Sequence, residues 1–329
     1  MKKEKFGVMI YPATPKYNVG DYVQSLAARQ YLPSVDTFVE REKLSAYEGD
    51  PVNMIMNGWY IHDTSAWPPS PKINPLFVSF HINSHAVDGI LTDEGVSYLK
   101  KHQPIGCRDF HTERLLLEKG VDAYYSGCLT TTLDIDFKST VKTDKIYFAD
   151  PLFQLPNWEK MNYSKKAFVK GILKGEFLKF STRDNILKSL FSENLLNKAE
   201  WIPHKLSGSH SEERRFKEAE DVLKKYASAK FVVTSRIHCA LPCLAVGTPV
   251  IFLNFGFDQK MDLCRFEGIT NLFNTINLDS PGIIEANLHL PTGKIEENFK
   301  FENPDRYVEF ASKLKEKAAA FVSSVRSAE

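Results

Sequence analysis

Short apolar runs recur along the chain, and polar turns and helical patterns separate them. Residues 6–10 and 76–82 are continuous apolar runs, which are typical of strands buried on both faces. Apolar residues at positions 23, 26, 27 and 31 lie on one face of a predicted helix, and Pro33 ends that helix. This alternation predicts a parallel α/β sheet.

The same pattern continues to the C-terminus. Further strands are predicted at 37–39, 52–57, 105–107, 123–125, 146–149, 200–203, 231–234, 250–253 and 272–273. Further helices are predicted at 92–101, 110–119, 183–195, 212–226, 239–245, from 261 and at 304–323. The polar stretch 138–145 reads as a linker. We therefore expect two Rossmann-like domains, residues 1–140 and 141–329, with the C-terminal helix packing back on the first.

Composition narrows the class of protein. The 329 residues exceed one typical core, and a net charge of +1 argues against a nucleic-acid partner. The five cysteines are scattered and mostly lie in apolar runs, so we expect reduced thiols in a cytoplasmic protein. The N-terminal apolar run is too short for a signal peptide, and no run approaches the roughly 20 residues of a membrane span.

Residues 231–253 carry the strongest chemical signal. They read as strand, turn, short apolar helix and strand, with Ser235, Arg236 and His238 in the turn. Ligands of parallel sheets bind at this strand edge, and helix N-termini attract anions. If the helix begins near Cys239, Pro242 falls in its first turn, where a missing N–H costs little. We expect a phosphate or carboxylate site here; the alternative is that Arg236 pairs with a structural acid and His238 caps the helix.

Two other turns are predicted at the same edge. The first holds Asn18, Gly20, Asp21 and Gln24, in which Gly20 lets a ligand approach the backbone and Asp21 is either a functional carboxylate or the helix N-cap.

The second turn holds Arg108 and Asp109. Arg108 is a candidate anion fork, and Asp109 is a natural helix cap. His81 follows a strand and is either a cleft residue or a satisfied strand-end histidine. No zinc-peptidase, P-loop or nucleophile-elbow motif occurs, so we predict no metal and no cofactor.

Taken together, these motifs resemble the polysaccharide pyruvyltransferase family. The resemblance spans residues 5–275, and the segment from Ser235 to Ile251 carries most of it. It implies a GT-B-like pair of Rossmann domains, phosphoenolpyruvate as donor, and a sugar diol as acceptor that becomes a pyruvate ketal. Arg236, His238, Ser235 and Arg108 would then serve the donor, with Arg236 and His238 catalytic. Asn18, Gly20, Asp21, Gln24 and His81 would lie on the acceptor side or in the cleft.

The residues fit that chemistry independently. Phosphoenolpyruvate carries about three negative charges, which suit two arginine forks and a helix N-terminus. His238 would donate the proton to the methylene carbon or assist departure of phosphate. The base that activates the sugar hydroxyls stays open between Asp21 and His81.

Three alternatives remain open at this point. One is a GT-B glycosyltransferase or sialyltransferase that uses a nucleotide sugar, although no clear base or ribose pocket is visible. Another is a glycan- or anion-binding module without catalysis. The third concerns residues 158–180, whose lysines and aromatics are either a solvated helical face or a contact with the inner membrane surface, where a lipid-diphosphate-linked acceptor would lie.

Overall fold

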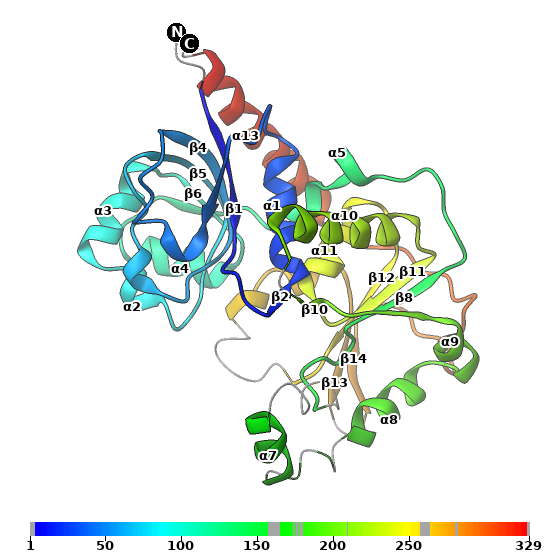
Figure 1. The fold of residues 1–329 in the computed structure, drawn as a ribbon. Helices are drawn as coiled ribbons and strands as arrows, with labels where there is room; N and C mark the ends of the chain where they lie inside the picture. Colours follow the sequence, from blue (N-terminus) through cyan, green and yellow to red (C-terminus); the bar gives the residue numbers. More distant parts are fainter. Residues whose placement is uncertain are drawn as a thin grey trace.

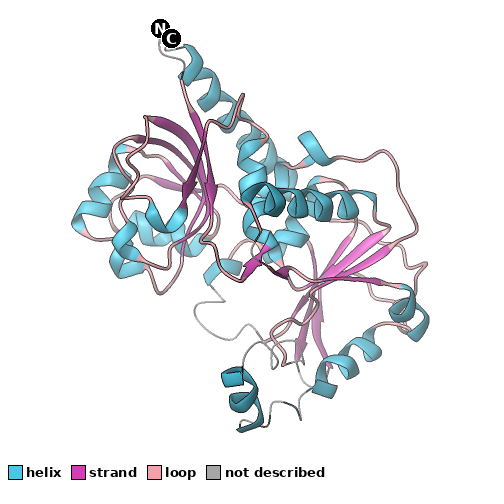
Figure 2. Cartoon of the chain, in the orientation of Figure 1, coloured by secondary structure: helices cyan, strands magenta, loops and turns pink. Residues whose placement is uncertain are grey.

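The chain forms two parallel sheets with helices between and around them (Figures 1 and 2). This computed structural model describes residues 4–156, 165–173, 175, 177, 180–208, 210–256, 264–279 and 282–327. Part of the lysine- and aromatic-rich stretch, including Trp158, Lys160 and Tyr163, lies outside the described residues, as does Met261. Among the described residues, no helix combines the length and apolarity that crossing a membrane requires.

The first sheet has six parallel strands in the order β3-β1-β4-β5-β6-β7. The strands are β1 (Phe6–Ile10), β3 (Thr37–Glu40), β4 (Val52–Tyr60), β5 (Ile73–Ile82), β6 (Ile105–Cys107) and β7 (Ala123–Tyr125). After β1 the chain adds β3 on one side and then β4 to β7 on the other. The direction of winding therefore changes between β1 and β4, which is where such sheets open a crevice for ligands.

The second sheet repeats this plan. Its order is β14-β13-β12-β11-β8-β9, and β14 is the antiparallel strand. The strands are β8 (Ile146–Ala149), β9 (Glu200–Ile202), β11 (Phe231–Thr234), β12 (Val250–Asn254), β13 (Asn274–Asp279) and β14 (Gly282–Ala286). The winding reverses between β8 and β11, so this sheet opens its crevice beside Asp150 and Ser235.

Helices cover both sheets. They are α1 (Val19–Arg29), α2 (Val87–Ile90), α3 (Asp93–Lys101), α4 (Phe110–Glu118), α5 (Asp134–Phe137), α7 (Lys165–Leu173), α8 (Phe180–Leu190), α9 (Glu193–Lys198), α10 (Glu212–Ser228), α11 (Ile237–Ala245) and α13 (Tyr307–Ser327). Short 3-10 turns are η1 (Arg41–Lys43), η2 (Thr64–Ala66), η3 (Leu129–Thr132), η5 (Cys264–Phe266) and η6 (Thr270–Leu272). The mixed α/β class predicted from the sequence is confirmed. The GT-B-like arrangement and the division at residue 140 stay predictions.

A small antiparallel ribbon joins the two halves. Its strands are β2 (Lys16–Asn18) and β10 (Lys205–Ser207), and Lys205 pairs with Asn18. One strand follows β1 of the first sheet and the other follows β9 of the second. The backbone N–H of Val19 also donates to the carbonyl of His204 at 2.8 Å, so the start of α1 is bonded to the second half.

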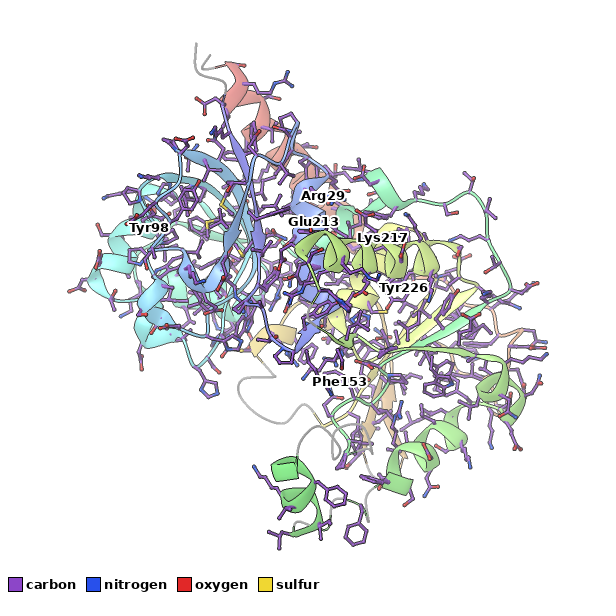
Figure 3. All side chains as sticks on the ribbon, in the orientation of Figure 1. Arg29, Tyr98, Phe153, Glu213, Lys217 and Tyr226 are labelled. Carbon is purple, nitrogen blue, oxygen red and sulfur yellow. The ribbon has the colours of Figure 1, made fainter. Side chains whose placement is uncertain are left out.

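The two halves also share one hydrophobic core. Val23 and Leu26 of α1 belong to the same buried cluster as Phe216 of α10 and Leu241 of α11. Arg29 extends this contact at the surface, because its guanidinium bonds Glu220 and lies 5.4 Å from the Phe216 ring (Figure 3). Burying α1 between the first sheet and the helices α10 and α11 of the second half removes apolar surface that neither half covers alone.

The C-terminal helix α13 lies beside the first strand. Phe6 of β1 forms a separate buried cluster with Val322 and Val325 of α13. Lys315 of α13 bonds Asp134 of α5 at 2.7 Å. The last described helix is thus packed onto elements from the first 140 residues, as Figure 1 shows in red and blue.

The sequence misplaced several boundaries. Helix α1 begins at Val19, so the segment predicted as a turn is already helical and Asn18 is the cap. The predicted helix at 183–195 is two helices, α8 and α9, and the predicted strand at 272–273 is wrong because η6 ends there and β13 begins at Asn274. Strands of three residues such as β2 and β10 carry too little periodicity to be found.

Candidate active site

Two cavities adjoin where the winding of each sheet reverses. The arginine cavity has a volume of about 460 Å³ and the tyrosine cavity about 540 Å³. The arginine cavity is lined by Asn18, Gly20, Asp21, Arg41, Trp59, His62, Asn83, Arg108, Phe153, His204, Lys205, Ser235, Arg236, Ile237, His238, Arg265 and Phe266. The tyrosine cavity is lined by Tyr11, Pro12, Thr14, Lys16, Tyr17, Asn18, Asp21, Tyr22, Arg41, His62 and Lys205. Five residues line both, so the cavities share one wall.

Strand ends and helix starts supply the side chains. Arg41, Asn83 and Arg108 follow β3, β5 and β6 of the first sheet, and Arg236 follows β11 of the second. The N-termini of α1 and α11 reach the same cavity through Gly20 and His238. Each helix N-terminus carries a partial positive charge, which acts together with the charges of the arginines. The arrangement therefore favours an anion.

Charge in the arginine cavity is strongly asymmetric. The cations on its wall are Arg41, Arg108, Arg236, Arg265 and Lys205. Among the described lining residues, Asp21 carries the one carboxylate. Burial and the nearby charge of Arg236 lower the pKa of Lys205, which indicates that these cations repel one another at close range.

Arg108 lies almost fully buried on this wall. It is 1 % exposed, and its Nε and Nη2 donate no hydrogen bond to any described residue. The carboxylate of Asp109 lies 3.7 Å from Nε. Buried guanidinium N–H groups without acceptors are costly, so this geometry is well suited to a bound oxyanion.

Arg236 is held by a carboxylate rather than standing free. Its Nε and Nη2 donate to one oxygen of Asp150 at 2.9 and 2.7 Å, and its guanidinium lies 3.4 Å from the centre of the Phe153 ring. The pairing with an acid that the sequence left open is therefore present. The guanidinium still reaches the cavity, so the contacts orient it without removing it from the site.

Ser235 connects three strand ends. Its hydroxyl donates to the carbonyl of Leu253 at 2.6 Å and accepts from the N–H of Leu152 at 2.8 Å. Ser235 borders the cavity but is only 1 % exposed. These bonds hold the turn that carries Asp150, and a direct role of Ser235 in donor binding stays a prediction.

His238 lies at a kink inside α11. Its φ and ψ of −81° and 17° are not helical, and Pro242 follows four residues later. Proline lacks the N–H that would bond the carbonyl of residue 238, and its ring crowds that carbonyl, so the first turn is distorted. The helix begins at Ile237 rather than Cys239, which puts Pro242 inside the helix and not in its first turn.

The imidazole of His238 has an unused nitrogen. Nε2 is buried and makes no hydrogen bond to a described residue. Burial, together with the charges of Arg108 and Arg265, holds the pKa of His238 well below its usual value. Arg236, not His238, occupies the N-cap position of α11, and no side chain caps that helix. The alternative that His238 is the cap is therefore wrong.

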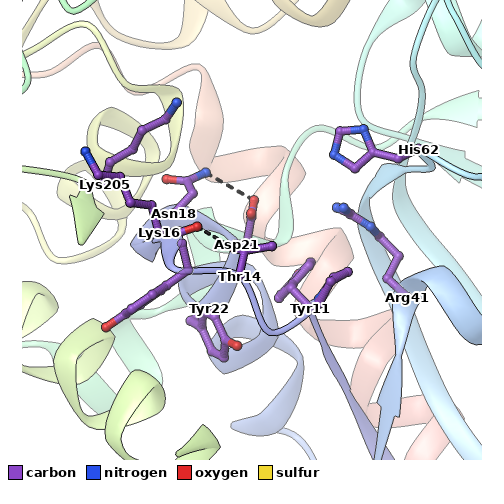
Figure 4. Close-up of a pocket in the computed structure, with 11 residues that line it drawn as sticks. Tyr11, Thr14, Lys16, Asn18, Asp21, Tyr22, Arg41, His62 and Lys205 are labelled. Carbon is purple, nitrogen blue, oxygen red and sulfur yellow. Dashed lines mark hydrogen bonds between the residues drawn. The ribbon is translucent and has the colours of Figure 1, made fainter. Parts of the chain in front are cut away.

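Asp21 is the carboxylate that borders both cavities (Figure 4). Asn18 is the N-cap of α1, and its side-chain oxygen accepts from the N–H of Gly20 at 3.2 Å. The alternative that Asp21 is the cap is wrong, and its carboxylate instead accepts from Asn18 Nδ2 at 3.2 Å. Burial raises the pKa of Asp21, while Arg41 and the Asn18 bond oppose that rise.

Two predicted residues lie away from the cavity walls. His81 is 0 % exposed, and its Nδ1 lies 2.6 Å from an Asp109 oxygen. Burial and the charge of Arg108 lower the pKa of His81 to about 4. Gln24 is also buried, with its amide 3.5 Å from the carbonyl of Gly20. His81 therefore contacts the neighbour of Arg108, and Gln24 contacts Gly20, without lining the cavity themselves. Asp109 caps α4 as predicted, because it accepts from the N–H of Thr112 at 2.9 Å.

Four lysines and arginines that line the cavities were not predicted from the sequence. Arg41 sits in η1, where its guanidinium lies 4.4 Å from the Trp59 ring and 5.0 Å from the Tyr11 ring. Arg265 and Lys205 come from segments with no motif, and Lys16 belongs to the ribbon. The available signal for Arg41 was its place two residues after the predicted strand 37–39. Arg265, Lys205 and Lys16 offered no such signal.

The cysteines lie in the interior rather than in a site. All five are buried and unpaired in disulfides, as expected for reduced thiols. Within the described part of the chain, no group of three His, Cys, Asp or Glu side chains could hold a metal ion.

The fold and site define a class of protein: two doubly wound sheets that meet around an arginine-lined cavity, next to a second cavity, with a carboxylate on the wall that the two share. The sequence comparison makes this specific. The family model for polysaccharide pyruvyl transferase matches residues 18–255, from the cap of α1 to the end of β12, and the chain belongs to this family. Membership implies polysaccharide pyruvyl transferase activity.

Other comparisons add little. No curated protein matches the chain. A solved structure of a functionally uncharacterised protein from Klebsiella pneumoniae is 14 % identical, with a TM-score of 0.43, and the match covers 79 % of this chain and 87 % of that one.

Proposed function

We propose that the chain transfers the enolpyruvyl group of phosphoenolpyruvate to two hydroxyls of a sugar in a bacterial surface polysaccharide or its lipid-linked precursor. Phosphoenolpyruvate would occupy the arginine cavity. The observation that carries this proposal is the buried guanidinium of Arg108, whose unused N–H groups face a wall of further cations. A ligand with phosphate and carboxylate groups would satisfy both charge and hydrogen bonding.

The reaction moves two protons and breaks the bond between C2 of phosphoenolpyruvate and its phosphate oxygen. One sugar hydroxyl adds to C2 of the donor while C3 takes up a proton and becomes a methyl group. The C2–O bond to phosphate then breaks, and the oxygen of the second hydroxyl takes the place of the phosphate on C2. The two hydroxyl protons balance the new methyl hydrogen and the proton on the released phosphate.

His238 is suited to the proton transfer to C3. It is neutral in the free site because burial and neighbouring arginines depress its pKa. A bound donor would bring negative charge beside it and raise that pKa, which favours the protonated imidazole. The acid is thereby charged when the substrate is in place.

Asp21 is suited to accept a hydroxyl proton. It lies on the wall between the two cavities, and burial raises its pKa toward the range of an effective base. The buried His81 does not border either cavity, so this geometry favours Asp21 over His81 as the base.

The test follows phosphate release from phosphoenolpyruvate upon addition of lipid-linked glycans, with ketal formation read by mass spectrometry. Glycan-dependent release is expected, and Arg108→Gln should lower kcat/KM about a hundredfold because charge-assisted hydrogen bonds to the donor are lost. Arg326→Gln, at an exposed position of α13, is the matched control and should retain activity. Stabilisation by nucleotide sugars but not by phosphoenolpyruvate in a thermal shift would contradict the proposal.

The same assay tests the fork of Arg236. Arg236→Lys keeps the charge but loses the planar contacts to Asp150, so turnover should fall sharply. Near-native turnover in that variant would overturn the donor assignment of Arg236.

Contact with the inner face of the membrane and a cytoplasmic location remain part of this proposal. A lipid-diphosphate-linked acceptor would be met at that surface. Flotation with vesicles that contain anionic lipid, compared with neutral vesicles, tests it.

A further inference from the structure

The tyrosine cavity has its own charge pattern, distinct from that of the arginine cavity. Six of its residues line it alone: Tyr11, Pro12, Thr14, Lys16, Tyr17 and Tyr22. Three are tyrosines with buried rings, and one is a lysine. A volume of about 540 Å³ is in the range of small-ligand sites.

Basic side chains lie on both sides of this cavity, and burial together with the charge of Arg41 lowers the pKa of His62, so the cations are Lys16, Lys205 and Arg41 (Figure 4). Lys16 and Lys205 lie on one side, Arg41 and His62 on the other, and Asp21 lies between them. Lys16 and Lys205 come from β2 and β10, and the ribbon pairs Lys205 with Asn18, which places the two lysines near one another. Their like charges repel, which contributes to the lowered pKa of Lys205.

This charge balance does not suit a neutral sugar alone. A plain glycan offers hydroxyls, which one carboxylate and one amide could orient. Asp21 is the one carboxylate among the described lining residues, and Arg41 is paired with Glu42 at 2.8 Å. Lys16 and Lys205 together therefore favour a ligand group that carries negative charge on their side of the cavity. Tyr11, Tyr17 and Pro12 add apolar groups to the lining of the cavity.

We propose that the tyrosine cavity binds the sugar acceptor through an anionic group, a phosphate or a carboxylate, that is held on the side of Lys16 and Lys205 while the reacting hydroxyls face Asp21. This rests on the proposed function, because the five residues that line both cavities would then bring the acceptor beside the donor. Lys16 allows acceptor binding to be tested separately from donor binding. It lines the tyrosine cavity and not the arginine cavity.

The experiment is titration calorimetry with three probes that share one ring: glucose, glucuronic acid and glucose 1-phosphate. Each is added to the full chain, both alone and saturated with phosphoenolpyruvate. At least one anionic probe should bind about tenfold more tightly than glucose, since a charge-assisted bond adds to the ring contacts. Comparison of the carboxylate and phosphate arms tells which anion the cavity accepts.

Two variants sharpen the result. Lys16→Gln should reduce affinity for the preferred anion about tenfold, to the level of glucose, and leave the affinity for phosphoenolpyruvate within about twofold. Lys101→Gln, at an exposed position of α3, is the control and should change neither. The Lys16 side chain is partly exposed on a short ribbon, so its substitution is compatible with folding.

The outcomes separate the two proposals. Equal binding of glucose and both anions, no binding of either anion, or unchanged anion binding in Lys16→Gln overturns the assignment of the tyrosine cavity. Absence of phosphoenolpyruvate binding to the unmodified chain contradicts the proposed function instead, and the probes added without it still decide the character of the tyrosine cavity.

Discussion

At the scale of single residues, the contact between Gly20 and His238 links the two halves at the site. A Cβ at position 20 would lie 3.1 Å from His238 Cβ and 3.4 Å from its Nδ1. Glycine therefore lets the first turn of α1 approach the imidazole that the proposed reaction uses. This close approach is a second reason for a glycine there, beyond access of a ligand to the backbone.

Gly20→Ala should displace the imidazole with little loss of stability. Alanine favours a helix over glycine by about 0.5–1 kcal/mol, which offsets part of the crowding. We expect kcat/KM to fall about tenfold while the melting temperature changes by only a few degrees. Gly293→Ala is the control, because nothing lies within 4 Å of a Cβ there. Native activity in Gly20→Ala would show that the position of the His238 imidazole does not depend on a glycine at position 20.

The buried His81 makes stability depend on pH. Its folded pKa of about 4 lies below the value of about 6.5 in an unfolded chain, so unfolded molecules bind the proton first as the pH falls. Stability is thus greatest above pH ~6.5 and declines toward pH ~4, and His81 contributes on the order of 1–2 kcal/mol of that decline by pH ~5.

Denaturant unfolding between pH 7 and pH 5 checks this expectation. His81→Asn should show a shallower decline than the unmodified chain, whatever its stability at neutral pH. The pKa of Asp109 is lowered, so its own titration adds little in this interval. An identical slope in the two proteins would mean that His81 is protonated in the folded state.

At the scale of elements, the kink in α11 shapes the site. Pro242 leaves the carbonyl of His238 without its helical donor, and the backbone at His238 departs from helical geometry. Replacing Pro242 with alanine restores that donor. The first turn can then become regular, which reorients the imidazole.

Pro242→Ala should therefore separate stability from activity. Proline inside a helix costs about 3 kcal/mol relative to alanine, so the melting temperature should rise or stay constant even though the buried ring is lost. Turnover should fall at least about tenfold, because the proposed proton donor, His238, is misplaced. Pro304→Ala, just before α13, serves as the comparison. Loss of stability together with activity would mean that packing of the proline ring dominates.

Element patterns explain what the sequence could and could not predict. The strands flanking the motif, β11 and β12, and the cap at Asp109 follow from local periodicity and residue type. Arg108 and Arg236 could be assigned because each follows a strand in a sheet of predictable direction. Lys205, Arg265 and Lys16 could not, since only the folded chain brings their segments to the cavities. The pairing of Arg236 with Asp150 likewise depends on the register of β8 and β11.

At the scale of the whole molecule, α1 belongs to both halves. Its buried face contacts the first sheet, and the same cluster includes side chains of α10 and α11. The ribbon of β2 and β10 adds backbone hydrogen bonds across the same boundary. Each half also has a buried cluster of its own, but the cluster around α1 is complete only when the two halves are together.

The chain should consequently unfold in one cooperative transition. Trp59 and Trp67 belong to the first sheet and its turns, and Trp201 belongs to β9 of the second. Tryptophan fluorescence and far-ultraviolet circular dichroism should give the same midpoint in urea. Two separated midpoints would show that the halves are independently stable.

The wall common to the two cavities has a practical consequence for altering what the enzyme accepts. Substitutions at Asn18, Asp21, Arg41, His62 or Lys205 touch both cavities, so selection at those positions will trade one substrate against the other. Positions 12, 14 and 16 line the tyrosine cavity alone and lie before α1. A directed-evolution library confined to them is where new acceptor preferences should emerge while donor turnover persists.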